Sequence, residues 1–336
     1  MRSDIYITKP AYYDGFRCLA GACPDSCCQE WDVQVDDASA AFYRSLPGPL
    51  GERLRQVLQD EDGETVMSII QGRCPMWQAD GLCRIQAELG EAALCQTCRQ
   101  FPRLTHDYGD FVELGLELSC PEAARLILTT PQAQPVIQAL SGGTEGDYDQ
   151  EAMDTLKRTR RTALSLLDLP GYSIGQRLCL LLLYGCQAQQ ELDLGEEAPF
   201  DPQSAMETIR QFAKPGSMAD IFRFFADLEI LTPRWEALLQ HPGQPRFPQE
   251  TWNLARYFVE RYWLQAVSDY DLVGRVKFIL VSCLMIAALE GSFLENAQLY
   301  SKEIENSWEN VEAILDSVCT SPVFTDDRLL GLLLKT

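Results

Sequence analysis

The feature that most constrains this chain is the uneven distribution of its cysteines. The chain has 13 cysteines in 336 residues, and nine of them fall within the first 120 residues. The nine are Cys18, Cys23, Cys27, Cys28, Cys74, Cys83, Cys95, Cys98 and Cys120. The N-terminal sequence MRSDIYITKPAYYDGF has no apolar core and no small-residue cleavage site, so we expect a cytoplasmic protein rather than a secreted one. Disulfides explain thiols poorly in a reducing compartment, so the sequence predicts that these nine are metal ligands.

The remaining cysteines have a different sequence context. They are Cys179, Cys186, Cys283 and Cys319. Each lies in an apolar segment of helical character, where a free cysteine behaves as a small buried hydrophobe. We expect no ligand role for them.

Thiolate ligands favour either zinc or an iron–sulfur cluster. Cys95 and Cys98 have the short spacing that lets two thiolates bind one centre; a redox-active pair would instead need a strand–helix context. The plant-type ferredoxin spacing, C-x4-C-x2-C, would need a cysteine at residue 26, which is serine. The C-x3-C-x2-C spacing of radical enzymes would need a cysteine at residue 30, which is glutamate. The ligands must therefore come from dispersed segments. With only two histidines, His106 and His241, an all-cysteine site is favoured over a mixed one.

Basic side chains accompany these thiols. Four arginines lie within a few residues of a cysteine: Arg17, Arg84, Arg99 and Arg103. Burial of several thiolates around a metal leaves a negative charge that guanidinium groups would offset. The alternative is that they are ordinary surface residues.

The sequence predicts a mainly α fold, with a small cysteine-rich α+β unit over residues 1–130 and an all-helical bundle over 151–336. Residues 131–150 contain two prolines and three glycines, which indicates a linker or a long loop. Within the first unit we expect a strand at 31–35, helices at 36–46 (capped by Asp36 or Asp37), 50–59 and 121–128, and one arm of a β-hairpin at 110–118.

The second part is almost entirely helical by its apolar periodicity. Proline and glycine pairs separate the predicted helices, which are 151–168, 173–191, 202–213, 217–230, 248–267, 270–290, 296–319 and 325–335. The segment 270–289 is apolar nearly all round, so we expect it to be the central helix of the bundle.

The net charge of −21 excludes several functions. An acidic surface repels phosphate backbones, so we expect no nucleic-acid partner. The same surface favours a binding partner that presents basic groups, such as lysine side chains.

The longest apolar run, 278–289, is too short to span a bilayer, which leaves only peripheral membrane association open. No glycine-rich phosphate loop and no alternation of strands and helices supports a nucleotide-binding sheet.

Four segments together resemble the bacterial flagellin lysine-N-methylase family. In order they are FRCLAGACPDSCCQEWDVQVD, RCPMWQADGLCRIQAELGE, CQTCRQFPR and ELSCPEAARLIL. The resemblance is dense over residues 10–128, about a third of the chain. The Cys-Cys pair, the C-x8-C pair and the C-R-x-F-P run also resemble a broader group of small cysteine-cluster proteins.

The resemblance implies an enzyme that transfers methyl groups from S-adenosylmethionine to lysine side chains of flagellin, its partner, in the cytoplasm. It also implies an iron–sulfur cluster, of the [4Fe–4S] type, held by the nine N-terminal cysteines. Nine thiols exceed the four that one such cluster needs, so either two centres form or several of the cysteines are structural. The residues near the cysteine motifs that could accept a proton from lysine are Tyr12, Tyr13, Glu113 and Glu117.

Two other classes of function compete with this interpretation. The first is a non-catalytic zinc or iron–sulfur module that docks a protein partner. The second is an electron-transfer or redox-sensing protein. Catalytic residues, the cofactor-binding residues and the oligomeric state are not assigned by the sequence.

Overall fold

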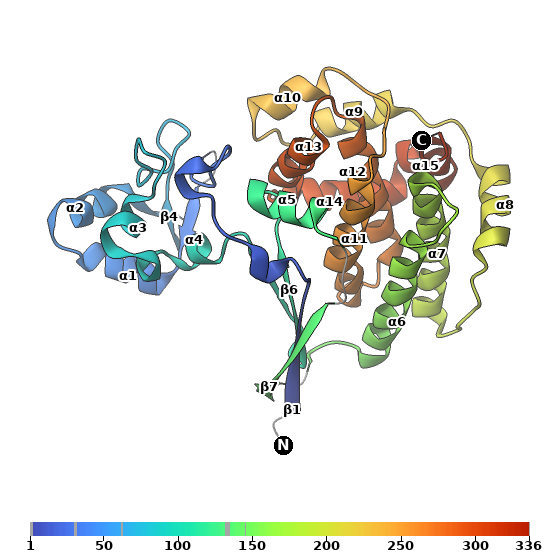
Figure 1. Ribbon diagram of the computed structural model, residues 1–336, viewed down its shortest axis with the longest axis horizontal. Helices are drawn as coiled ribbons and strands as arrows, with labels where there is room; N and C mark the ends of the chain where they lie inside the picture. Colours follow the sequence, from blue (N-terminus) through green and yellow to red (C-terminus); the bar gives the residue numbers. More distant parts are fainter. Residues whose placement is uncertain (1–2, 30–31, 62, 132–134, 145, 336) are drawn as a thin grey trace.

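The computed structural model of the protein describes residues 3–29, 32–61, 63–131, 135–144 and 146–335. Within them lie fifteen α-helices and seven β-strands, and all the strands precede the last ten helices in the chain. Figure 1 shows the cysteine-rich N-terminal part at one end of the molecule and the bundle of helices at the other. The predicted fold class, a mainly α chain with an α+β N-terminal unit followed by helices, is confirmed.

The small α+β unit has a sheet and a hydrophobic core of its own. Its antiparallel sheet has the strand order β2–β4–β3, with bounds Val33–Val35, Glu64–Met67 and Leu58–Glu61. Its helices are α1 (Asp37–Ser45), α2 (Gly48–Val57), α3 (Arg84–Leu89) and α4 (Gln96–Gln100). Its core gathers apolar side chains from residues 33–95, among them Val33, Tyr43, Leu54, Met67, Met76 and Ile85.

The local signals in this unit explain its elements. The predicted helix 36–46 is α1, whose N-cap is Asp36; the carboxylate accepts the N–H of Ser39 at 3.0 Å, as an N-cap should. The predicted helix 50–59 is α2, but its last two residues begin β3 instead. The predicted strand 31–35 is present as β2, and residue 31 lies outside the described residues.

A second, mixed sheet has the order β5–β6–β1–β7, with bounds Arg103–Asp107, Phe111–Leu116, Ser3–Lys9 and Val136–Gly143. The turn between β5 and β6 contains Gly109 at φ 91°, which confirms the hairpin predicted at 110–118. β1 runs parallel to β6 and antiparallel to β7. The segment 131–150, predicted as a linker or long loop, thus contains a strand that pairs with the N-terminal strand.

The helix predicted at 121–128 is α5 (Pro121–Thr129), which begins at its proline. Although α5 and β6 lie within the predicted 1–130 unit, their apolar side chains join the core of the helical part. Ala123, Ala124 and Ile127 of α5 are almost fully buried there.

Ten helices form the C-terminal part. They are α6 (Gln150–Leu167), α7 (Ile174–Leu194), α8 (Pro202–Phe212), α9 (Met218–Ala226), α10 (Pro233–Leu239), α11 (Glu250–Tyr262), α12 (Leu272–Ala288), α13 (Phe293–Tyr300), α14 (Trp308–Thr320) and α15 (Asp326–Leu333). The sequence predicted no helix at the position of α10. It also predicted a single helix at 296–319, where the chain forms α13, a π-helical turn (η5, Ser301–Glu305) and α14.

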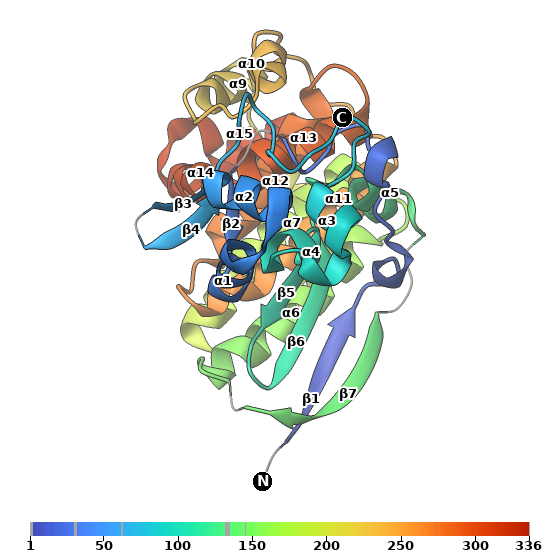
Figure 2. The same cartoon turned by 90° about the vertical axis from the view of Figure 1, so that its left-hand side faces the viewer.

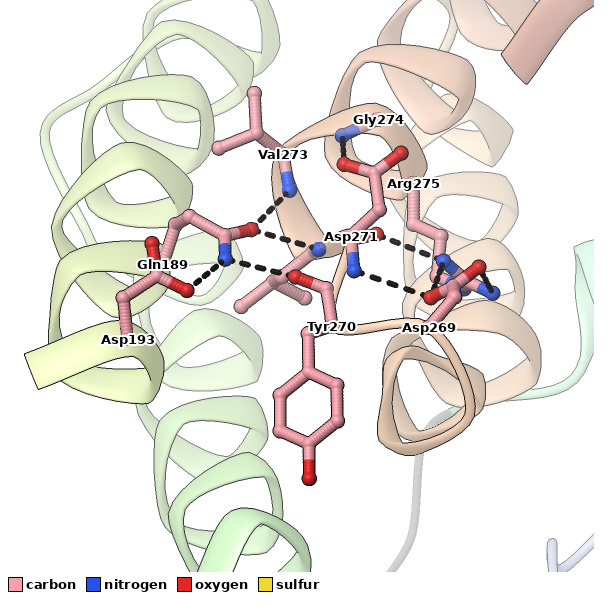
Figure 3. A network of polar contacts seen from close by, with 9 residues as sticks. Gln189, Asp193, Asp269, Tyr270, Asp271, Val273, Gly274 and Arg275 are labelled. Atoms are coloured by element: carbon pink, nitrogen blue, oxygen red, sulfur yellow. Dashed lines mark hydrogen bonds and ion pairs between the residues drawn. The ribbon is translucent and has the colours of Figure 1, made fainter. Parts of the chain in front are cut away.

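The predicted central helix is α12, in which nearly every side chain is buried. Its N-terminus is fixed by polar groups (Figure 3), since the first N–H groups of a helix have no partner within it. The Asp271 carboxylate accepts the N–H of Gly274 at 2.8 Å. From α7, the Gln189 side-chain oxygen accepts the N–H groups of Leu272 and Val273 at 2.8 and 3.1 Å.

Replacing Asp271 by alanine is expected to lower the free energy of unfolding by about 1 kcal/mol, because the cap of the central helix is lost. Urea unfolding followed by circular dichroism would measure the change. Glu312→Ala, on the exposed face of α14, is the control and should stay within about 0.5 kcal/mol of the wild type. Equal stabilities of the two variants would show that Gln189 alone secures this helix end.

The cysteine-rich unit lies against the helical bundle, and the mixed sheet extends below both (Figures 1 and 2). Polar contacts join the two parts: the Gln298 side chain donates to the Asp25 carboxylate and to the Ser119 carbonyl, both at 2.8 Å. The Lys302 ammonium pairs with Asp25 at 3.2 Å. Among the described helices, none is both long and apolar enough to cross a membrane.

Candidate functional site

The structure brings the nine N-terminal cysteines to one cavity. The cavity has a volume of about 470 Å³ and lies between the α+β unit and the start of α5. Its lining includes Cys18, Cys23, Cys27, Cys28, Cys74, Cys83, Cys95, Cys98 and Cys120. We call it the cysteine cavity. Cys179, Cys186, Cys283 and Cys319 do not line it. Cys179 and Cys283 are fully buried among apolar helices, as predicted, and Cys186 is half-buried. The predicted burial is wrong for Cys319, which is exposed near the end of α14.

Loops and helix starts position these thiols. The first four cysteines come from the loop before β2, and the N–H of Cys74 donates to the Cys28 carbonyl at 2.8 Å, which joins two loops. Cys83, Cys95 and Cys120 are the N-cap residues of α3, α4 and α5. Backbone N–H groups of the first helical turn approach all three sulfur atoms, and such donors favour the thiolate form.

The thiols also contact one another. Hydrogen bonds from the thiols of Cys27 and Cys74 lower the pKa of Cys28, and a hydrogen bond from Cys98 lowers the pKa of Cys95 to about 7. The thiolate, which is the form that binds metals, is thus favoured at Cys28 and Cys95, whereas burial raises the pKa of Cys23, Cys83 and Cys120. In the described part of the chain, no three Cys, His, Asp or Glu side chains converge where they could hold a metal ion directly. The nine cysteines are instead spread over the walls of the cysteine cavity.

Three of the four arginines predicted to accompany the thiols line the cysteine cavity, namely Arg17, Arg99 and Arg103. Arg84 does not; it forms a salt bridge with Glu88 at 2.6 Å on the surface of α3. The guanidinium groups of the three can offset the negative charge of a thiolate-bound centre.

A second cavity, of about 450 Å³, adjoins the first. The two share six lining residues, which are Asp25, Ser26, Cys27, Phe101, Arg103 and Ser119. The second cavity reaches the helical part, where its lining includes Glu117, Glu305, Leu231 and Lys302. We call it the carboxylate cavity.

Buried charges lie beneath the carboxylate cavity. The Glu305 side chain is fully buried, and its carboxylate receives Arg261 Nε at 3.2 Å and the Tyr262 hydroxyl at 2.8 Å. The Glu117 carboxylate lies 3.9 Å from Arg261 and accepts a long hydrogen bond of 3.4 Å from Ser119. Burial raises the pKa of Glu117, and Arg261 opposes that shift.

The π-helical turn η5 supplies one wall of the carboxylate cavity, with Lys302, Glu305 and the following Asn306. Such turns are rare in proteins overall, and those that occur are often found at functional sites. The sequence does not predict this wall, because the apolar period continues through it. The signal that could have revealed the break is Ser307, which caps α14 by accepting the N–H of Asn310 at 3.3 Å.

The four candidate proton acceptors near the cysteine motifs have different surroundings. Glu113 is committed to a two-point ion pair with Arg160, at 2.5 and 2.8 Å. Tyr12 is 9% exposed and belongs to the main hydrophobic core, and Tyr13 packs against it. Glu117 is the one among these four that lines a cavity described here.

A helical domain beside a cavity lined by nine cysteines defines a cysteine-cluster protein. The chain is similar to the flagellar biosynthetic protein FliU of Salmonella muenchen, with 34% identity over 140 residues, which are 39% of this chain and 81% of FliU. It therefore belongs to the flagellin lysine-N-methylase family, as its motifs predicted.

Lysine-N-methylases of Salmonella typhimurium and Salmonella choleraesuis are also 34% identical to the chain over 140 residues. The match covers 39% of this chain and 34% of each of them, so the chain spans about a third of the length of these relatives. No protein-family profile and no solved structure matches the chain.

Proposed function

We propose that this protein transfers methyl groups from S-adenosylmethionine to lysine side chains of flagellin in the cytoplasm, with an iron–sulfur cluster bound by its N-terminal cysteines. The observation that carries the proposal is the meeting of nine cysteines at one cavity, in a chain related to proteins named lysine-N-methylase. The net charge of −21 supports a substrate that presents lysine side chains.

Thiol ligands suit an iron–sulfur cluster or zinc, and the cluster is favoured because no three side chains of the described residues converge on a single ion. All nine candidate ligands are thiols, and the cysteine cavity falls within the range of about 300–1,000 Å³ that holds drug-sized ligands. When bound, such a cluster would supply a coordination position for the amine and carboxylate of the methyl donor. Arg17, Arg99 and Arg103 would offset its negative charge.

The reaction sets requirements that the chain must meet. The lysine nitrogen must be neutral to attack, although its ordinary pKa is about 10.4, and removal from water lowers that value. The nitrogen then bonds to the methyl carbon while the carbon–sulfur bond breaks, and S-adenosylhomocysteine leaves. The proton passes from nitrogen to a base or to water. The carboxylate cavity provides a partly enclosed space beside the cysteine cavity for this amine.

The test is methyl transfer by the full chain. Protein purified without oxygen, incubated with S-adenosylmethionine and flagellin, is expected to add methyl groups to flagellin lysines, seen by mass spectrometry as steps of 14 daltons. The matched control is flagellin whose lysines have been acetylated, which has no free amine and should stay unmodified.

Two results would contradict the proposal in different ways. Protein that binds S-adenosylmethionine and leaves flagellin unmodified would have another substrate. Protein that binds no S-adenosylmethionine would favour the docking module, and stoichiometric zinc without sulfide would replace the cluster by a zinc site.

A further inference from the structure

We propose that the carboxylate cavity is the acceptor site of the protein, where the ammonium group of a target lysine binds to Glu117. This inference rests on the proposed function, because it assigns the place where the methyl acceptor of that reaction binds. It concerns a cavity that contains Cys27 but lies mainly between α4, the segment that follows β6 and the π-helical turn η5.

The charges of the cavity favour a cationic ligand at Glu117. Of the three acidic side chains in the lining, Asp25 is already bonded to Gln298 and Lys302, at 2.8 and 3.2 Å. Glu305 holds the Nε of Arg261 at 3.2 Å. Glu117 has only the 3.9 Å approach of the same guanidinium and the long bond from Ser119, so its carboxylate keeps capacity for a strong donor.

The basic side chains of the lining are less suited to hold an anion. The Lys302 ammonium is engaged by Asp25. The Arg103 guanidinium lies over the ring of Phe16, 5.3 Å from its centroid. An anionic ligand would also have to approach the three carboxylates, which would repel it.

The shape suits a lysine side chain, which has an apolar four-carbon stem and a charged end. Phe101 and Leu231 contribute apolar walls, and the half-buried Glu117, whose side chain is 20% exposed, supplies the carboxylate. Leu231 is 37% exposed beside the exposed Ile230, so an apolar rim is available to the protein that presents the lysine. The rim is held in place because the Leu231 N–H donates to Glu303 at 2.8 Å.

The position suits transfer between two sites. Cys27, Phe101 and Ser119 line both cavities, so at most one layer of side chains separates the carboxylate cavity from the cysteine cavity. An amine bound at Glu117 therefore adjoins the space in which we place the cluster and the methyl donor.

The experiment measures amine binding without methyl transfer. Full-length protein purified without oxygen is titrated with a lysine-containing peptide in the absence of S-adenosylmethionine, by calorimetry. The same peptide carrying acetyl-lysine should bind at least about tenfold more weakly, because the ammonium is lost. Equal binding of the two peptides would overturn the inference.

Variants locate the site. Glu117→Gln keeps the shape of the side chain and removes its charge, so the dissociation constant of the lysine peptide should rise about tenfold or more. Glu236→Gln, an exposed change of the same charge on α10, should leave it within about twofold. Glu117→Asp, which keeps the charge on a shorter stem, should bind with intermediate affinity. Unchanged binding by folded Glu117→Gln protein would overturn the inference.

Two further arms separate the possible outcomes. If S-adenosylmethionine displaces the peptide competitively, the carboxylate cavity is the donor site and the inference fails. If the peptide binds through Glu117 and no methyl group is ever transferred, the proposed function fails while the ammonium site stands. If methyl transfer is intact and the KM for the peptide is unchanged in Glu117→Gln, the inference about the acceptor site fails and the proposed function stands.

Discussion

Protein in which Cys95 and Cys98 are both replaced by serine is expected to lose its iron and acid-labile sulfide and, with them, methyl transfer. Both thiols line the cysteine cavity, and their mutual hydrogen bond lowers the pKa of Cys95 to about 7, so this pair readily supplies thiolate. Serine preserves the size of the side chain, but the pKa of its hydroxyl is far too high for it to supply an anionic ligand in place of the thiolate. The iron content should fall to background.

The matched control is Cys319→Ser, an exposed cysteine of α14 that lies far along the chain and outside both cavities. It should retain iron, sulfide and activity. Iron and sulfide assays with an absorption spectrum, on protein purified without oxygen, make the measurement. Full iron content in the double variant would exclude these two cysteines as ligands, and zinc without sulfide in the wild type would exclude the iron–sulfur cluster.

The same assay bears on the number of centres. The interactions among the thiols do not divide them into two sets, because Cys27 interacts with Cys28 and also with Cys18 and Cys120. If two centres form, the Cys95/Cys98 variant and Cys120→Ser should each keep the iron of the centre that it leaves intact, so complete loss of iron in the Cys95/Cys98 variant would itself indicate one centre. One shared centre would lose all of it in either case.

The elements with strong local signals could be predicted from sequence. Asp36 caps α1, Pro121 begins α5, and the alternation at 110–118 gives β6, because each signal lies within one turn or one strand. β1 and β7 were not predicted, since each is completed by backbone pairing with a strand more than a hundred residues away. The prolines and glycines of 131–150 favoured a loop, although the segment 136–140 at the start of β7 is largely apolar.

The candidate site was predictable in its chemistry and not in its geometry. Clustered cysteines predict metal ligands even when the paths of the loops that carry them are unknown. The nine thiols could therefore be named from the sequence before their cavity was known. Glu117, Arg261 and Glu305 come from three distant segments, so no spacing relates them. The π-helical turn that places Glu305 also interrupts a helix whose apolar period continues.

Replacing Arg261 by methionine is expected to lower the free energy of unfolding by about 3–5 kcal/mol, because one partner of a buried ion pair is removed. The Arg261 side chain is 12% exposed and the Glu305 side chain 0% exposed, so water cannot replace the lost guanidinium. The Tyr262 hydroxyl would remain at 2.8 Å from Glu305, but a neutral donor does not balance the charge. Guanidinium chloride unfolding of purified protein would measure the change.

The control for this change is Arg44→Met, which breaks an exposed pair with Asp60 and should cost less than about 1 kcal/mol. The double variant Arg261→Met/Glu305→Gln should regain part of the lost stability, because neither buried charge is then left alone. A loss in Arg261→Met as small as that in Arg44→Met would mean that water reaches Glu305 and that the base of the carboxylate cavity is solvated. In that case the buried pair would not hold α11 and the π-helical turn together beneath the proposed acceptor site.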